Sequence, residues 1–499
     1  MPTIPSTLTL SGTPSRSRGR RLLASRAFAP GDLIAMFNNN NNSDGDALVA
    51  IPDSAHLSST CSWCLSSSSS SSESGSIAVR TCTGCRAAAY CSTPCQRADW
   101  ARAHKGECKA FQRVRAEGRD ATMLPTPVRA LVRLLLLMAR SGDAAAVGEL
   151  EGHVGAFRDA KIDGSGSERW RDMELQALAA LHYLGREASP GSVAGAVEIL
   201  CKMQVNSFNM ADADIEQSGL FLDPALAMVN HSCVPNAFVQ FAGRKAMLRA
   251  YQEIKKDEEV EISYIESLNS NMSLQRNVEE VYPGCSTSLQ GIDTLEKREE
   301  LRRRWSMCKQ LRKTKMFAIE PLSQVLVEAG VYFGEQGDFA AALAISCFIA
   351  LEIDPYRYPM PFAAQRVKSL LMIAKLLTNT APGVSSPPIG DTKGAAKTRL
   401  SELLAKTDQV TICHAMLVLV LHWGPAAHSS EWQVCSEAKG LLKDIKTLPG
   451  REKEYAMVET LYRNPNGPDE SIYFEIGVLR PIRELSEIAL DIMALEFES

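Results

Sequence analysis

The sequence predicts an α+β protein in which a zinc-binding finger interrupts a β-rich region and an all-helical region follows. Three observations lead to this fold class. Seven cysteines and one histidine crowd into residues 61–108, and short apolar strand patterns lie on both sides of them, at residues 22–34 and 239–264. No strand pattern occurs after about residue 316. A chain of 499 residues is long enough for two to four domains.

The finger is the most specific signal in the chain. Its ligands form four closely spaced pairs: Cys61-x2-Cys64, Cys82-x2-Cys85, Cys91-x3-Cys95 and His104-x3-Cys108. A short spacing lets one tight turn offer two ligands to the same ion, and a tetrahedral structural zinc needs two such pairs. Eight ligands therefore predict two closed zinc sites, with no open position for a catalytic water. The competing interpretation is a set of reduced cysteines without metal, and four correctly spaced pairs argue against it.

Composition and charge exclude some classes of function. Apolar residues make up 45% of the chain and charged residues 22%, with a net charge of -4, as in a soluble globular protein without the basic excess of nucleic-acid-binding proteins. Basic runs at residues 16–26 and 297–315 are interpreted as solvated faces. The seven cysteines outside the finger are scattered and odd in number, which indicates a reducing compartment, cytoplasmic or nuclear. The longest apolar run, residues 131–139, is too short for a membrane span, so we expect no membrane partner.

The N-terminus allows two interpretations. Residues 1–31 contain arginine, serine and threonine but no acid, which is the composition of a mitochondrial transit peptide. Alternatively, residues 20–34 form opening strands of a folded domain, because a Pro-Gly-Asp turn at residues 30–32 precedes an apolar strand pattern. We favour the strands, since a second motif gives this segment a place in a fold.

That second motif spans residues 223–266. Asn230-His231-Ser232-Cys233 is followed by Pro235-Asn236, by a predicted hairpin with arms at residues 239–241 and 246–250, by a charged turn at residues 254–259, and by a last strand at residues 260–264. Four matching residues alone are weak evidence. The ordered set of motif, hairpin, turn and strand is specific.

This order resembles the catalytic half of a SET domain. The finger, with Tyr90 before Cys91 and Trp100 between Cys95 and His104, resembles a MYND finger. Together they resemble the SET-and-MYND family of protein-lysine methyltransferases over nearly the whole chain. By this resemblance the ligand pairs interleave, so that one ion is held by Cys61, Cys64, Cys91 and Cys95 and the other by Cys82, Cys85, His104 and Cys108.

The resemblance also implies a domain order. We expect the N-terminal part of the SET domain at residues 1–55, the finger at 56–110, an inserted helical segment at 111–205, the SET catalytic core at 206–270, a degenerate post-SET segment at 271–315, and a TPR-like helical domain at 316–499. Apolar helical faces at residues 128–138 and 173–184 suit the inserted segment. Residues 337–355 resemble the second helix of a tetratricopeptide repeat with its Asp-Pro stop.

The implied activity is transfer of a methyl group from S-adenosylmethionine to a lysine of a histone or non-histone protein. For such an in-line displacement the protein supplies alignment and electrostatics. Carried over motif by motif, the cofactor-binding residues are Arg20, Asn206, Asn230, His231 and Tyr264. The hydroxyl of Tyr264 is also expected to orient the target amine, which makes this tyrosine the expected catalytic residue. A lone strand tyrosine is more often core, and only the ordered set supports these roles.

Two departures from the family fall on functional parts. The family's Gly-Arg-Gly reads Gly19-Arg20-Arg21 here, and the sequence leaves open whether Arg21 fits. The family's post-SET Cys-x-Cys-x2-Cys cluster is absent from residues 298–310, which hold one cysteine. Together with Cys233 this gives two ligands, so a third zinc is not expected. Trp305 and Met307 stand where aromatic residues of the lysine channel are expected. Either packing by Trp305 substitutes for the zinc, or the channel is poorly formed.

A second class of function stays open: a catalytically weak or inactive adaptor that binds proline-containing partner peptides at the finger. The degenerate post-SET segment and Arg21 favour the adaptor. The residues that favour the enzyme, which is the interpretation we prefer, are Asn206, Asn230, His231 and Tyr264. A DNA-binding zinc protein lacks support because the chain has neither a basic balance nor a recognition-helix motif. We expect the finger to be a modular insertion whose zinc drives its own folding.

Overall fold

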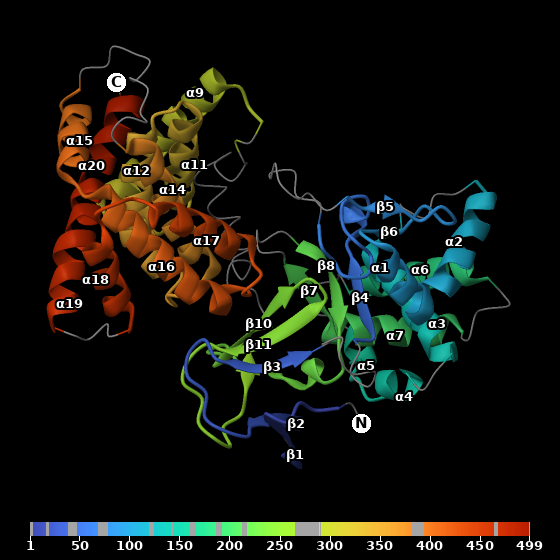
Figure 1. Ribbon diagram of the computed structural model, residues 1–499. Coiled ribbons are helices and arrows are strands. Elements are labelled where there is room, and N and C mark those ends of the chain that lie inside the picture. Colours follow the sequence, from blue (N-terminus) through green and yellow to red (C-terminus); the bar gives the residue numbers. More distant parts are fainter. Residues whose placement is uncertain are drawn as a thin grey trace. The chain divides into compact units, whose positions relative to one another are not determined.

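The computed structural model describes residues 3–15, 19–37, 47–67, 78–118, 124–140, 143–159, 166–185, 192–211, 217–264, 289, 291–381, 394–463 and 468–498. The chain divides into two compact units, Met1–Tyr264 and Ile265–Ser499. Among the described residues, strands occur in the first unit only and the second unit is helical (Figure 1). The predicted α+β fold class, with a helical C-terminal part, is confirmed.

The sheets of the first unit join strands from distant parts of the sequence. β1 (Leu8–Ser15) pairs with β2 (Gly19–Ala24), and two three-stranded sheets have the orders β10-β11-β3 and β4-β8-β7. Their members are β3 (Leu33–Phe37), β4 (Val49–Pro52), β7 (Phe208–Ala211), β8 (Gln217–Leu222), β10 (Ala237–Ala242) and β11 (Lys245–Ala250). The predicted hairpin is β10 and β11, and its partner β3 precedes the finger. The strands before the finger therefore complete sheets whose other strands come after the helical insertion.

A short parallel pair completes the strand network. β9 (Asn230–His231) pairs with β12 (Glu261–Ile262), and the residues just before β12 bond to β2. The amide of Val260 donates to the carbonyl of Leu22 over 2.9 Å, and the amide of Ala24 donates to the carbonyl of Glu258 over 2.8 Å. The end of the SET-like region thus lies between the chain's first strands and its Asn-His motif.

The finger and the helices that follow it are built from short, well-capped elements. The finger contains β5 (Arg80–Thr81), β6 (Ala89–Tyr90), α1 (Thr93–Asp99) and α2 (Lys105–Ala116), and the helical insertion contains α3 (Thr126–Arg140), α4 (Asp143–Gly148), α5 (Val154–Asp159), α6 (Gly166–Leu184) and α7 (Val193–Asn206). The hydroxyls of Ser92 and Ser192 cap α1 and α7 by accepting backbone N–H groups, as N-cap serines do. The helices expected at residues 128–138 and 173–184 are confirmed within α3 and α6.

The expectation that the finger is a modular insertion is wrong. The buried zinc-ligand cysteines share one hydrophobic core with the inserted helices: Cys61, Cys82, Cys85 and Cys108 belong to the same cluster as Phe111, Leu131, Ala177 and Leu200. The reason lies in α2, because this helix supplies Cys108 to the finger and also buries Phe111 against Tyr183 of α6, with ring centroids 6.1 Å apart. One helix therefore serves both the metal site and the core.

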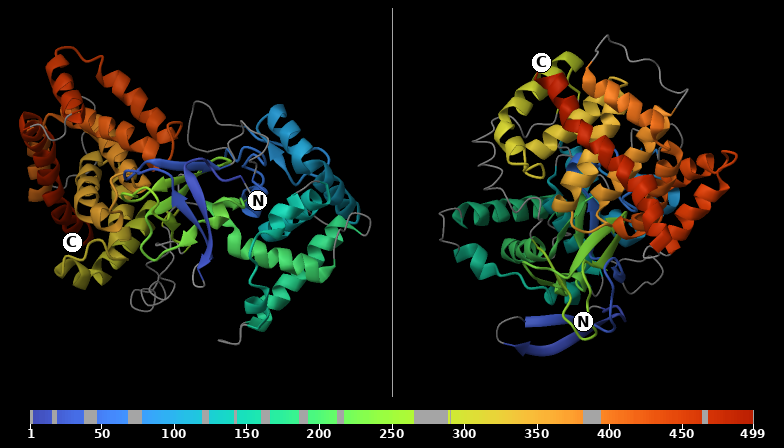
Figure 2. Two further views of the ribbon diagram at one scale, coloured as in Figure 1. Left: turned by 90° about the horizontal axis from the view of Figure 1, so that it is seen from below. Right: turned by 90° about the vertical axis from the view of Figure 1, so that its left-hand side faces the viewer.

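The second unit is a stack of helices (Figure 2). Its α-helices are α9 (Thr294–Met307), α10 (Lys309–Lys313), α11 (Leu322–Glu335), α12 (Phe339–Phe348), α13 (Asp354–Arg357), α14 (Ala364–Thr380), α15 (Ala395–Lys406), α16 (Gln409–Ala427), α17 (Gln433–Ile445), α18 (Glu452–Arg463), α19 (Pro468–Phe474) and α20 (Arg480–Phe497). Successive helices α11 and α12 pack together, and α12 also packs on α14 and α20. Asp338 begins α12 by accepting the amide of Ala341.

Trp305 belongs to the core of this second unit and does not line an open channel. Its side chain is 1% exposed, its indole N–H donates to Glu498 over 3.0 Å, and the guanidinium of Arg312 lies 4.0 Å from its ring. The expectation that Trp305 serves as a channel residue is therefore wrong. The physical reason is its position in α9, whose buried face, with Leu301, packs against α11 and α20.

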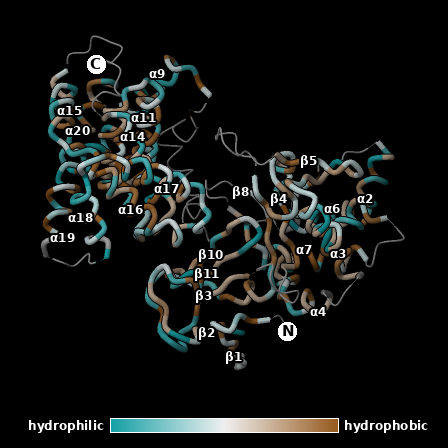
Figure 3. The backbone as a smooth tube through the Cα atoms, in the orientation of Figure 1, coloured by the Kyte–Doolittle hydropathy of each residue, from teal (hydrophilic) through white to brown (hydrophobic). Residues whose placement is uncertain are grey.

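Two helical stretches of the second unit, Phe339–Arg357 and Gln409–Ala427, are long and apolar enough to cross a membrane when judged by length and composition alone. The sequence expectation that no stretch reaches this length is therefore corrected. Burial of 50% and 56% of these stretches is what core helices show, since they pack on other helices of the unit. Figure 3 shows that the helices of this unit carry both hydrophobic and hydrophilic residues.

The second unit should lose stability in acid through Glu300. Its carboxylate accepts hydrogen bonds from Arg303 and Arg304, which lower the pKa of Glu300 to about 2. Because this pKa lies below the value in the unfolded chain, the stabilisation is present at neutral pH and is lost as the pH falls from about 4.3 towards about 2. We expect the difference in Tm between wild type and Glu300→Gln to shrink over this range. Exposed Glu299→Gln is the matched control, and an equal pH dependence for both variants would contradict the assignment.

Candidate active site and zinc sites

The eight predicted zinc ligands meet in two groups of four. One group is Cys61, Cys64, Cys91 and Cys95, the other is Cys82, Cys85, His104 and Cys108, and the ligand atoms of each group all lie within 4.8 Å of one another. The measured separations, such as 3.6 Å from the sulfur of Cys64 to that of Cys91, match the edge of a tetrahedron with Zn–S bonds of about 2.3 Å, which is about 3.8 Å. The residues therefore fit two structural zinc ions in the interleaved arrangement.

The single histidine of the second group is oriented as a metal ligand. Nε2 of His104 lies 3.7 Å from the sulfur of Cys85, and Nδ1 lies 3.3 Å from the carboxylate of Glu107. A zinc-binding histidine usually donates its other ring N–H to such a carboxylate, which holds the ring in place. The donor set of this group is therefore three thiolates and one imidazole nitrogen.

The finger also abuts the sheet of the first unit. The guanidinium of Arg244, at the β10–β11 turn, lies 4.0 Å from the ring of Trp63, inside the first ligand pair. Gly243 in the same turn has a φ of 55°, and a Cβ at this position would lie 2.7 Å from the carbonyl oxygen of Cys64. A glycine is required here for both reasons. The finger is thus held by the hairpin on one side and by the inserted helices on the other.

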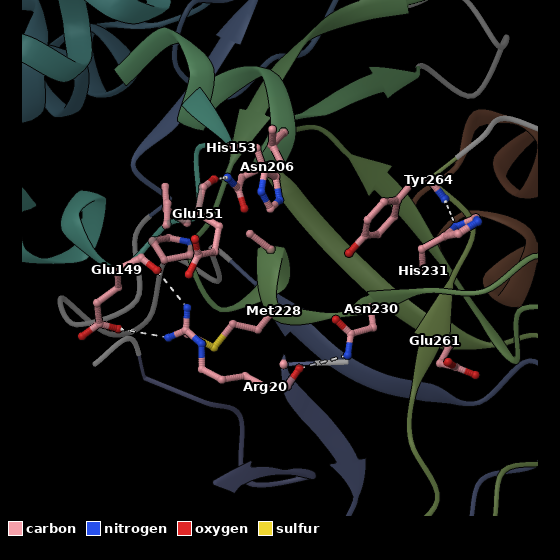
Figure 4. Close-up of a pocket in the computed structure, with 15 residues that line it drawn as sticks. Arg20, Glu149, Glu151, His153, Asn206, Met228, Asn230, His231, Glu261 and Tyr264 are labelled. Atoms are coloured by element: carbon pink, nitrogen blue, oxygen red, sulfur yellow. Dashed lines mark hydrogen bonds and ion pairs between the residues drawn. The ribbon is translucent and has the colours of Figure 1, made fainter. Parts of the chain in front are cut away.

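A pocket of about 680 Å³ lies in the first unit, and all five predicted cofactor residues line it (Figure 4). Its wall comes from β2, from residues 149–153, from the end of α7, from residues 224–231 and from residues 261–264. Asp223 shapes the fourth segment, because its carboxylate accepts the amides of Ala225 and Leu226. The elements of the ordered motif therefore do converge on one cavity.

Asn230 fastens three segments of the pocket together. Its side-chain amide donates to the carbonyl of Arg20 over 2.9 Å and to the carboxylate of Glu259 over 2.8 Å. Both amide hydrogens are used in these two bonds, which leaves the carbonyl oxygen of the side chain as the group that can meet a ligand. Asn230 is therefore part of the frame of the pocket as well as part of its lining.

Asn206 joins two segments of the helical insertion in the same way. Its amide donates to the carbonyl of Glu151 over 2.8 Å and to that of Lys202 over 2.7 Å. Arg20 contributes a third tie, since its guanidinium donates to the carbonyl of Glu149 over 2.8 Å. These bonds hold residues 149–153 against the pocket.

Sequence reasoning missed that segment. The lining residues Glu149, Glu151 and His153 come from the connection between α4 and α5, and Met228 and Glu261 were also not predicted. His153 has a φ of 45°, which is unusual for a residue other than glycine, but this conformation is visible only in the fold. Nothing in the order of these residues resembles a motif.

The structure answers the question left open at Arg21. Gly19 has the positive φ, 67°, whereas Arg21 lies inside β2 in register with Ser11. An arginine fits an extended position without strain. Its guanidinium lies 3.8 Å from the carboxylate of Glu259, the same carboxylate that accepts Asn230. Arg21 therefore leaves the backbone of the pocket intact.

His231 and Tyr264 face each other at the other end of the pocket (Figure 4). Nδ1 of His231 accepts the backbone N–H of Tyr264 over 3.0 Å, and the two ring centroids are 5.2 Å apart. The hydroxyl of Tyr264 donates to the carbonyl of Val229 over 2.6 Å, and partial burial raises the pKa of this phenol above its ordinary value. The phenol therefore stays neutral at physiological pH and acts as a hydrogen-bonding group.

Comparison with known proteins agrees with this geometry. Residues 19–265 match the SET domain family. The chain is 35% identical over 214 residues to the SET domain and MYND-type zinc finger protein 6 of Schizosaccharomyces pombe, covering 43% of this chain and 39% of that protein. It is 28% identical over 276 residues to the histone-lysine N-methyltransferase ASHR1 of Arabidopsis thaliana, covering 53% and 51%. It is 33% identical over 193 residues to the N-lysine methyltransferase SMYD2-A of Danio rerio, covering 38% and 41%.

The chain thus spans between about two-fifths and one half of the length of these relatives. A solved structure of Rubisco LSMT bound to AdoMet covers 95% of the chain at 11% identity and a TM-score of 0.30, which is too distant to carry an argument. The split sheets, the matched region and the pocket define a SET-domain protein. The two zinc-ligand groups inside that domain and these relatives support the SET-and-MYND family.

Zinc analysis tests the two ligand groups. We expect the purified chain to hold about two zinc ions per molecule and His104→Ala to hold about one. Because the finger shares its core with the inserted helices, the loss should also speed hydrogen exchange in α3 and α6, while α14 and α16 serve as an internal control. Elemental analysis and hydrogen-exchange mass spectrometry measure both effects. Faster exchange confined to residues 61–108 would restore the modular interpretation.

Proposed function

We propose that this protein is a protein-lysine N-methyltransferase that uses S-adenosylmethionine and acts on histone or non-histone protein substrates. The observation that carries the proposal is the single pocket in which Arg20, Asn206, Asn230, His231 and Tyr264 meet. These residues come from sequence positions more than 240 apart, and each belongs to a motif that the resemblance assigns to cofactor binding. Two zinc ions in the finger complete the proposal.

The size and lining of the pocket support a ligand of this kind. A volume of about 680 Å³ lies in the usual range for small-molecule sites. Apolar lining residues, among them Leu150, Val205 and Met228, alternate with polar ones, and three carboxylates, Glu149, Glu151 and Glu261, favour a positively charged ligand. S-adenosylmethionine, when bound, supplies a methyl group on a cationic sulfonium.

Tyr264 is proposed to position the target amine. Its hydroxyl hydrogen is used in the bond to the carbonyl of Val229, so the lone pairs of the phenol oxygen are left to accept a hydrogen bond from an amine. The raised pKa of this phenol keeps it neutral, so Tyr264 orients the amine without taking its proton. A lysine must arrive deprotonated to attack, and removal from water lowers the pKa of a lysine in that direction.

The frame residues are proposed to act through the walls of the pocket. Asn230 holds β2 against β9, and Asn206 with Arg20 holds residues 149–153 in place. Fixed walls place the cofactor and the amine in one geometry before reaction, which is the main contribution a protein makes to a direct displacement. Arg20, Asn206 and Asn230 therefore serve cofactor binding as part of this proposal.

The partners and the location of the protein are proposed from the reaction and from the state of its cysteines. Protein substrates follow from lysine as the acceptor, and we propose proline-containing peptides as ligands of the finger. The thirteen cysteines that the structure describes form no disulfide, which supports a cytoplasmic or nuclear location. No contact with nucleic acid or membrane is part of the proposal.

An adaptor without strong catalysis is the second candidate, and one observation favours it. The family's post-SET Cys-x-Cys-x2-Cys cluster is absent from residues 298–310, where the single cysteine, Cys308, is buried within the second unit, and no group of metal ligands among the described residues includes Cys233 or Cys308. Because Trp305 is buried within the second unit, it does not replace that zinc as an exposed wall residue. The adaptor interpretation predicts no methyl transfer.

Replacement of Tyr264 separates the two candidates. We expect Tyr264→Phe to retain cofactor binding and to reduce turnover by about 10²-fold, because it removes a contact felt mainly in the transition state. The assay is transfer of labelled methyl from S-adenosylmethionine to lysate proteins. Tyr251→Phe is the control, since Tyr251 packs on Phe238 and does not line the pocket. Equal incorporation by Tyr264→Phe and wild type would remove the tyrosine from the mechanism, and no incorporation by wild type would favour the adaptor.

Replacement of Asn230 should act on binding. Asn230→Ala removes both bonds of the side-chain amide and leaves the carboxylate of Glu259 without that donor, so β2 and β9 are no longer tied. We expect the affinity for S-adenosylmethionine to fall by about tenfold or more, as for loss of a hydrogen bond to a charged group. Calorimetric titration measures it. An unchanged affinity would show that the amide does not support the pocket.

A further inference from the structure

A buried arginine of the helical insertion lies between two carboxylates of the finger. Nε of Arg133, on α3, lies 2.6 Å from one oxygen of Glu107, and its Nη2 lies 2.8 Å from the other oxygen and 3.0 Å from the carboxylate of Asp99. The side chains are 5%, 7% and 0% exposed. Arg133 therefore lies on the buried face of α3 and is paired there, as a buried cation must be.

The two carboxylates reach further into the finger. Glu107 meets Nδ1 of His104, the zinc ligand of the second group, at 3.3 Å. Asp99 accepts the hydroxyl of Tyr90 over 2.8 Å, and Tyr90 immediately precedes Cys91. We name Tyr90, Asp99, His104, Glu107 and Arg133 the Arg133 cluster. It is a continuous set of contacts that leads from a helix outside the finger to one of its metal ligands.

The charges explain why the cluster needs the inserted helix. A buried carboxylate is costly unless a cation pairs with it, and the finger itself places two carboxylates, Asp99 and Glu107, in its own interior. The cation that pairs with both carboxylates is the guanidinium of Arg133, which belongs to α3. A bidentate guanidinium also fixes direction, so Arg133 sets the plane of the Glu107 carboxylate. The oxygen that accepts Nη2 of Arg133, Oε2, is also the oxygen that meets Nδ1 of His104.

We propose that Arg133 is a positioning residue for the second zinc site. By holding Glu107 against Nδ1 of His104, it keeps Nε2 turned towards the sulfurs of the group, and it thereby couples zinc retention at this site to the docking of α3 on the finger. The proposal rests on the two-zinc finger of the proposed function. It assigns to Arg133 an effect on one ion only.

The first zinc group provides the contrast. Its four ligands are thiolates, and the contacts made by their sulfurs include the hydroxyls of Ser66 and Ser92, which belong to the finger itself. Among the described residues, neither Arg129 nor Arg133 of α3 bonds to any of these four ligands. A change at Arg133 should therefore leave the first ion in place.

The α3 helix offers a matched control one turn earlier. Arg129 is also buried against the finger, but its guanidinium donates to the backbone carbonyl of Ala87 over 3.3 Å. Arg133→Met and Arg129→Met each remove one buried guanidinium from the same helix and retain an apolar stem. Arg133→Lys keeps the positive charge without the bidentate geometry, and it serves if Arg133→Met does not fold.

The experiment measures release of each zinc from the full chain to a chromophoric chelator. We expect Arg133→Met to lose one of its two ions with about 10- to 100-fold weaker retention, the usual effect of removing support from a metal-binding histidine, and Arg133→Lys to be intermediate. Arg129→Met should keep both ions within about twofold. Cobalt substitution identifies the ion, because a site of three thiolates and one imidazole absorbs differently from a site of four thiolates.

Three results would overturn the proposal. Unchanged retention in both Arg133 variants would show that His104 needs no such support. Equal weakening of both ions, or the same loss in Arg129→Met, would show a general effect on folding. A wild-type chain without zinc would remove the finger's proposed metal sites together with this inference, whereas either of the first two results leaves the two-zinc finger standing.

Discussion

The pocket depends on one side-chain amide. Asn230 donates to the carbonyl of Arg20, 210 positions earlier, and to the carboxylate of Glu259, and these two bonds join the first strands of the chain to the last. The main-chain bonds of residues 258–260 with β2 and the parallel pairing of β9 with β12 depend on the same alignment. The amide adds two side-chain bonds to these main-chain bonds, and together they hold the segments that carry Arg20, His231 and Tyr264 in a common register.

The zinc finger has a similar structural role on the other side of the first unit. Four of its ligands, Cys61, Cys82, Cys85 and Cys108, are buried in one core with α3, α6 and α7, and the hairpin turn at Gly243 lies against Cys64. Residues 149–153, which wall the pocket, follow α4 in the same helical insertion. The finger, the inserted helices and the pocket are therefore parts of a single folded unit, and a change in any one of them is felt through packed neighbours.

Local features of the sequence were sufficient for much of this site. Ligand spacing predicted the zinc pairs, because each pair needs only one turn, and the motif from Asn230 to Tyr264 gathered residues that do line one pocket. Residues 149–153 could not be predicted, since they are held through their backbone carbonyls by Asn206 and Arg20, and a carbonyl carries no sequence signature. The role of Trp305 was misjudged because its partner Glu498 lies 193 positions away. The role of Arg133, inside the apolar run at residues 131–139, could not be predicted because its two carboxylate partners lie outside its own helix.

The pocket is proposed to bind S-adenosylmethionine, and calorimetric titration of the full, zinc-loaded chain with that compound tests this binding most directly. We expect saturable binding at one site per chain, because one cavity collects Arg20, Asn206, Asn230, His231 and Tyr264. The titration does not depend on knowing the protein substrate. Absence of saturable binding, in a sample that holds two zinc ions and unfolds cooperatively, would show that this pocket is not a site for the cofactor.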